Sequence, residues 1–208
     1  MRKNLLLAAA LVLVLAWPSF AAAQGGPPQA RPAPIRGTIV KLDGNMLAVK
    51  TREGPTDMVM LAPNFAVRTL VREKLSDIHA GDFVGVTSVM GKDGKPHAVE
   101  VHVFPATLNI PDSQFPYDLR PNSTMTNAHV TGIAKAGGGS VLSVNYKTGS
   151  TDVVIDKKTV IVGPAPTQAT AADLKPHRAV YIIASKKDDG SFAATNVTVE
   201  KNGVKPPM

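Results

Sequence analysis

The residues of this chain that could do chemistry are its histidines, its recurring carboxylates and three closely spaced methionines. The five histidines are spread along the chain, at His79, His97, His102, His129 and His177. His97 and His102 are five residues apart in an expected strand, so they point to opposite faces and cannot chelate one ion as neighbours. His102 shares a face with Glu100, which indicates a solvated outer face. These positions predict no metal site, although His79, His129, His177 and Met125 would indicate one if three of them converged.

Carboxylates recur at matching places in the two halves of the chain. Asp77 and Asp173 each precede an aliphatic residue at an expected helical turn, and Asp93 and Asp189 each precede a glycine. A carboxylate at such a turn can accept hydrogen bonds from nearby backbone N–H groups. A structural role therefore accounts for these residues.

The methionines raise the question of a soft-metal site, because thioether sulfur is a ligand for soft metals. Met58 and Met60 share one face of an expected strand, and Met46 is nearby. The residues aligned with these three in the second half of the chain are aliphatic, namely Val153, Ile155 and Val141. We therefore expect the methionines to lie in the core, where methionine often fills gaps.

The composition excludes several kinds of chemistry. The chain has no cysteine, so it has no thiol nucleophile, no thiolate metal site and no disulfide. It also lacks a glycine-rich phosphate loop, a Gly-x-Ser-x-Gly elbow and a His-Glu-x-x-His helix. No nucleophile is paired in sequence with an evident base. We therefore expect a protein that is not an enzyme and that carries no cofactor.

An internal repeat organises these residues. The stretch 37–57 aligns without a gap to 132–152 at an offset of 95, and the matches include Leu47 with Leu142 and Val49 with Val144. Beyond this stretch the offset becomes 96, as for Val84 with Val180 and Asp93 with Asp189. Each copy reads as five or six short alternating strands with one short helical turn.

The repeat predicts an all-β chain of two tandem small β-barrels, closed or partly open, at residues 35–104 and 130–201. Closure would remove the bare sheet edges that an exported β-protein without disulfides must avoid. Residues 105–129 have no counterpart in the repeat and form the expected linker between the barrels. Loops of this length are usually functional or serve as linkers, and we expect Phe115, Tyr117 and Leu119 to pack against the barrels. An inter-barrel groove lined by Phe115, Tyr117 and Tyr146 is the candidate binding site.

The first residues of the chain indicate export. Arg2 and Lys3 precede an apolar run that stops at Pro18, and small residues then precede Gln24, which is the pattern of a signal peptide over 1–23. Residues 24–34 are rich in Pro, Gly and Gln and read as an extended tether, and 202–208 as a tail. We expect a periplasmic protein with no membrane segment after cleavage. The formal net charge of +7 is spread along the chain, which makes nucleic acid an unlikely partner.

The turn and core residues of the repeat resemble those of small exported bacterial β-barrel domains, often tandem, that are catalogued only as a domain of unknown function. The residues that carry the resemblance are Gly37, Ile39, Gly44, Leu47, Val49, Asp77, Ile78, Gly81, Asp82, Val84, Asp93, Gly94, Ala98, Val101 and Val103. The second copy departs from the pattern at His177 and Arg178, where the first has Gly81 and Asp82. The resemblance implies a barrel of the oligonucleotide/oligosaccharide-binding type and implies no catalytic residues.

Three classes of function remain open. The leading hypothesis is a non-enzymatic binding or scaffolding protein of the cell envelope, with an envelope protein or polymer as its partner. The first alternative is a barrel that binds an oligosaccharide or nucleic acid, which aromatic residues converging in a basic groove would favour. The second alternative is a metal- or stress-related periplasmic accessory protein.

Overall fold

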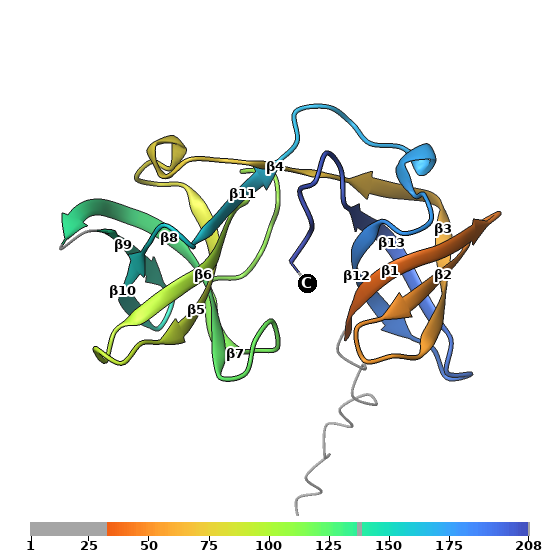
Figure 1. The fold of residues 1–208 in the computed structure, drawn as a ribbon, viewed down its shortest axis with the longest axis horizontal. Coiled ribbons are helices and arrows are strands. Elements are labelled where there is room, and N and C mark those ends of the chain that lie inside the picture. The colour runs from red at the N-terminus through yellow and green to blue at the C-terminus, as the bar shows by residue number, and fades with distance from the viewer. Residues whose placement is uncertain (1–32, 137–138, 208) are drawn as a thin grey trace, which may run out of the picture. The chain divides into compact units, whose positions relative to one another are not determined.

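A computed structural model describes residues 33–136 and 139–207, and it confirms the all-β prediction (Figure 1). The predicted signal peptide and most of the tether lie outside the described residues. Within the described residues, no helix is long and apolar enough to cross a membrane. The strands and 3₁₀ turns are β1 (Ala33–Asp43), β2 (Met46–Thr51), β3 (Thr56–Arg68), β4 (Leu70–Arg72), η1 (Leu75–Asp77), β5 (Phe83–Met90), β6 (Pro96–Val103), β7 (Ser113–Tyr117), β8 (Ser123–Ala136), β9 (Gly139–Tyr146), β10 (Gly149–Ile155), β11 (Val160–Pro164), η2 (Ala171–Asp173), β12 (Ala179–Lys186) and β13 (Phe192–Val199).

The strands form two closed barrels. Barrel 1 has the order β1-β12-β13-β3-β2, and all its neighbouring strands are antiparallel except β13 and β3. Barrel 2 has the order β10-β9-β8-β5-β6, and a parallel pairing of Val154 with His97 joins β10 to β6. The prediction of two small barrels is therefore confirmed.

The barrels do not coincide with the two repeats. Barrel 1 takes β1, β2 and β3 from the first repeat but β12 and β13 from the second. Barrel 2 takes β5 and β6 from the first repeat and β8, β9 and β10 from the second. The ranges 35–104 and 130–201 are therefore corrected as barrel boundaries, because each range supplies strands to both barrels. The repeats carry similar core residues, and exchange of an identical element between similar units is a known route of strand swapping.

The segments that cross between the barrels pair with each other. β4 follows β3, and β11 follows β10, and the two short strands are antiparallel, with Val71 opposite Gly163. β11 also pairs in parallel with β6, so the crossing segments continue the sheet of barrel 2. Each 3₁₀ turn then leads to the exchanged strands. The expected carboxylates hold these turns, because Asp77 accepts the N–H of Lys74 at 2.9 Å and Asp173 accepts the N–H of Thr170 at 3.0 Å.

Each barrel encloses one core built from both repeats. In barrel 1, Leu47 and Val59 of the first repeat pack with Val180 and Val197 of the second, and all four are fully buried. In barrel 2, Val84 of the first repeat and Leu142 of the second lie in one core and are also fully buried. Burying an aliphatic side chain of this size contributes about 1.5–3 kcal/mol. The alternation of apolar residues therefore places the core correctly, whichever strands are partners.

The methionines are not in the core, contrary to the sequence prediction. Met58 and Met60 are 43% and 41% exposed, and the buried residues of β3 are Val59 and Leu61. Leu47 lies opposite Val59, whereas its counterpart Leu142 lies opposite Val153. The hairpin of the second repeat is thus one residue shorter. A slip of one residue moves every side chain to the other face of a strand, which is why the gapless alignment misplaced the methionines.

His177, which replaces the Gly81 of the first repeat, keeps the backbone conformation of that turn. Gly81 has a φ of 95° and His177 has a φ of 66°, so both occupy the left-handed region. The N–H of Gly81 donates to the carbonyl of Val130 at 2.8 Å, and the N–H of His177 donates to that of Ile39 at 2.8 Å. The same turn therefore starts β5 and β12, although glycine avoids a strain that histidine must bear.

Candidate functional site

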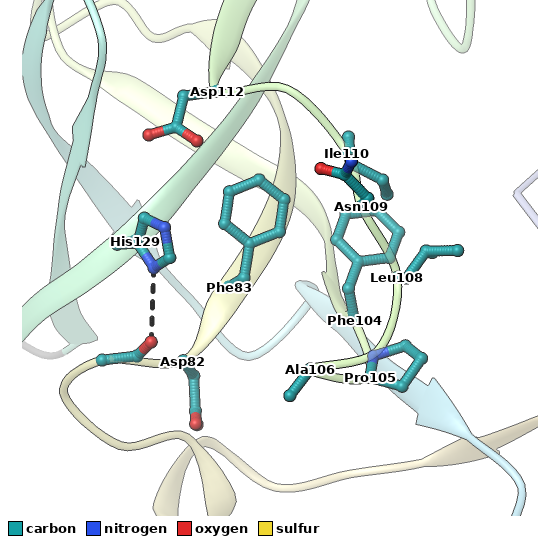
Figure 2. A pocket seen from close by; sticks show the side chains of 11 residues that line it. Asp82, Phe83, Phe104, Pro105, Ala106, Leu108, Asn109, Ile110, Asp112 and His129 are labelled. Atoms are coloured by element: carbon teal, nitrogen blue, oxygen red, sulfur yellow. Dashed lines mark hydrogen bonds between the residues drawn. The ribbon is translucent and has the colours of Figure 1, made fainter.

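A cavity of about 380 Å³ lies beside barrel 2, where β5 begins and β6 ends. Its wall includes Phe83 at the start of β5, Phe104 just after β6 and His129 on β8 (Figure 2). Residues 105–112 cover it, and they contribute Leu108, Ile110 and Asp112 among others. This loop belongs to the predicted linker, so part of the linker lines the cavity. The same linker holds β7 and the first residues of β8, which begins at Ser123.

Aromatic rings form a row along this wall. The rings of Phe83 and His129 have centroids 4.8 Å apart, and those of Phe83 and Phe104 are 6.0 Å apart. His102 stacks on Phe104, with centroids 4.6 Å apart and an interplanar angle of 22°. Gly85 makes room for this row, because a Cβ there would come within 2.8 Å of the Phe104 ring.

His102 and Glu100 are not on a solvated face, and that interpretation is corrected. Burial lowers the pKa of His102 to about 4, so its ring is neutral at pH 7. Burial also raises the pKa of Glu100 to about 7, although Arg72 and Arg36 oppose this effect. Alternation separates the two faces of a strand, but it does not tell whether another segment covers the outer one.

The polar groups of the cavity are a histidine, an amide and carboxylates. Nδ1 of His129 lies 3.3 Å from the carbonyl oxygen of Gly81, which can only accept, so Nδ1 carries the proton. Asp82 accepts the N–H of His79 at 2.7 Å, and Figure 2 shows its side chain turned away from the rings. Within the described residues, the carboxylate of Asp112 has neither a hydrogen-bond nor an ion-pair partner. Asp112 is therefore available to a ligand.

The structure places the predicted site residues Phe115, Tyr117 and Tyr146 in two separate environments. Phe115 and Tyr117 lie on β7, with ring centroids 6.2 Å apart, and Phe115 is 39% exposed. Tyr146 ends β9 and packs against the core of barrel 2. Within the described residues, a ring contact joins Phe115 to Tyr117, and none joins Tyr146 to either of them.

Tyr117 belongs instead to a cluster around Arg36, which the sequence did not indicate. The side chain of Arg36 is 1% exposed. Its guanidinium donates to Asp118 and to the hydroxyl of Tyr117, each at 2.7 Å. It also lies 5.0 Å from the ring centroids of both Tyr117 and Tyr181. Because Arg36 is on β1 of barrel 1 and β7 pairs with β8 of barrel 2, this cluster ties the linker to both barrels.

The histidines have local partners. His97 is 3.1 Å from Asp93, and His79 is 3.9 Å from Asp82. In the part of the chain that the structure describes, no three His, Asp or Glu side chains are grouped so that they could hold a metal ion.

Sequence reasoning missed Phe83 and Phe104 as site residues, and it considered His129 only as a possible metal ligand. A signal was present in the differences between the repeats, because Ala179 and Glu200 stand where the first repeat has Phe83 and Phe104. No protein-family model matches the chain, and comparisons with curated proteins and with solved structures found no similar protein.

Proposed function

We propose that the protein is a non-enzymatic binding protein of the cell envelope, and that the ring-lined cavity of barrel 2 holds a sugar residue of its ligand. The row of rings beside an unpaired carboxylate is the observation that carries this proposal. A sugar ring has apolar C–H faces that pack on aromatic rings, and its hydroxyls are donors for a carboxylate. Hydrogen bonds of the O–H···O⁻ type are among the stronger ones in proteins.

The fold supports the same proposal. Each barrel has five strands, of which one neighbouring pair is parallel. A 3₁₀ turn precedes the two exchanged strands of each barrel, η2 before β12 and η1 before β5. We assign it to the oligonucleotide/oligosaccharide-binding type, in agreement with the resemblance to exported tandem domains. Between those two ligand classes, Asp82 and Asp112 favour a neutral saccharide, because carboxylates repel the phosphates of a nucleic acid.

The residues of the cavity wall also support binding rather than catalysis. The described wall contains His129 and two aspartates, but no Ser, Thr or Lys that a base could activate. Residues 105–112 cover the rings and supply apolar contacts, as expected of a pocket that orients a ligand.

Titration of the isotopically labelled protein with short neutral oligosaccharides, a basic peptide and a single-stranded oligonucleotide tests the proposal. The amide signals of Phe83 and Asp112 should shift with a saccharide only. Phe104→Leu and Asp112→Asn should each weaken binding at least tenfold, whereas Phe115→Leu removes a ring outside the cavity and should leave it unchanged. Equal weakening by Phe115→Leu, or a response to the oligonucleotide alone, would overturn the assignment. Cell fractionation, with the mature N-terminus at Gln24, tests the envelope location.

A further inference from the structure

Three methionines, the half-buried Met46 and the exposed Met58 and Met60, form a cluster on the outer face of barrel 1. Met46 on β2 lies directly opposite Met60 on β3, and Met58 is two residues from Met60 on the same face. Met58 and Met60 are 43% and 41% exposed. Methionine is among the residue types most often buried, so two neighbouring exposed methionines beside a half-buried third call for an explanation other than core packing.

The register places the three sulfur atoms within reach of one another. Directly opposed residues have Cβ atoms about 4.5–5.5 Å apart, and diagonal neighbours about 7–8 Å. Met60 faces Met46 directly and Met58 faces it diagonally. Each methionine has an unbranched side chain with three rotatable bonds, so the thioethers can turn toward a common point. Ala48 lies opposite Met58 on β2 and is 3% exposed, so neighbouring side chains cover its small methyl group.

Thioether sulfur is a soft, uncharged ligand that selects soft metals such as Cu(I) over Zn²⁺ or Mg²⁺. We propose that Met46, Met58 and Met60 bind a single soft monovalent cation, Cu(I) or Ag(I), on barrel 1. The charged groups that flank the cluster on β1 are Asp43, opposite Met46, and Lys41, opposite Ala48. These two are paired with each other at 3.8 Å, and they are 80% and 63% exposed, so solvent screens them.

Barrel 2 provides an internal comparison. The residues at the same places in its β9 and β10 are Val141, which lies opposite Val154, and Asp152, which lies opposite Ser143. The same face of the same fold therefore carries no thioether in barrel 2. The methionines are thus a property of barrel 1 and not a requirement of the barrel.

The test is titration with Ag(I), a probe that avoids oxidation of the protein. The titration uses the protein as it is isolated from cells. One equivalent should bind, and the methyl signals of Met46, Met58 and Met60 should shift in an NMR spectrum while that of Met90 does not. Met90 is 68% exposed and lies on β5 of barrel 2, so Met90→Leu is the matched control. Met58→Leu combined with Met60→Leu should weaken binding at least tenfold.

Leucine keeps the face apolar but removes its sulfur. If the double leucine variant bound Ag(I) as well as the wild type, or if Met90 responded equally, the metal assignment would be wrong. The remaining explanation would be an apolar face that docks another protein, because leucine in place of methionine keeps that face apolar. A gain-of-function variant gives an independent measurement: Val141→Met, Asp152→Met and Val154→Met together should raise the stoichiometry from one ion to two. A stoichiometry that stayed at one would also contradict the proposal.

Discussion

Replacement of Arg36 should destabilise the protein more than replacement of any partner that Arg36 contacts. Its guanidinium makes two hydrogen bonds of 2.7 Å and lies between two tyrosine rings, and its side chain is 1% exposed. Hydrogen bonds that involve a charged group contribute about 1.5–3 kcal/mol each, but the desolvation of the guanidinium offsets part of this sum. We therefore expect Arg36→Ala to lower the free energy of unfolding by about 3 kcal/mol.

Two comparison variants separate the causes. Asp118 is 53% exposed, so Asp118→Asn should cost no more than about 1 kcal/mol, because water replaces the lost partner. Arg36→Met keeps much of the side-chain volume between Tyr117 and Tyr181 without burying a charge, and should cost less than Arg36→Ala. Urea denaturation at pH 7 measures all three. The reasoning is refuted if Arg36→Ala lies within 1 kcal/mol of the wild type, or if Arg36→Met is as destabilised as Arg36→Ala.

Two further predictions concern pH and backbone strain. Burial raises the pKa of Glu100 from 4.5 to about 7, so between these values the native state keeps a proton that the unfolded chain releases, and the free energy of unfolding falls as pH rises. Glu100→Gln should abolish this fall. At pH 8, urea unfolding should show the variant about 2 kcal/mol more stable than the wild type. If the free energy of unfolding changed with pH equally in the variant and the wild type, the burial of Glu100 would be contradicted. His177 is exposed with a φ of 66°, so His177→Gly should raise stability by about 1 kcal/mol in thermal unfolding, while Gly81→Ala lowers it. A loss of stability in His177→Gly would show that the ring makes contacts that outweigh the strain.

Local features of the fold could be predicted from the sequence. The alternation of Leu47 and Val49 located a buried face, and glycine and aspartate located turns, because both depend on residues close in sequence. The repeat also showed that the chain builds the same unit twice. These signals sufficed for an all-β fold with two barrels.

The features that were missed depend on distant residues or on exact hairpin lengths. The valines of β5 and β12 follow the same alternating pattern, so the pattern could not show that these strands are exchanged. The outward position of Met58 and Met60 follows from one residue in a hairpin, which a gapless alignment hides. The cavity rings come from two strands and from the segment just after a third, and only the folded chain brings Phe83, Phe104 and His129 together.

The exchange of strands between the repeats is the central claim, and engineered disulfides test it most directly. The chain contains no cysteine, and Thr38 on β1 lies directly opposite Ala179 on β12. Opposed antiparallel residues have Cα atoms about 4.5–5.5 Å apart, which suits a disulfide. Phe83 is the residue of the first repeat that corresponds to Ala179. Thr38→Cys with Ala179→Cys should form an intramolecular disulfide in the folded protein, seen by non-reducing electrophoresis, whereas Thr38→Cys with Phe83→Cys should stay reduced. A disulfide in the second pair and not in the first would show that each repeat closes its own barrel, and would contradict the exchange.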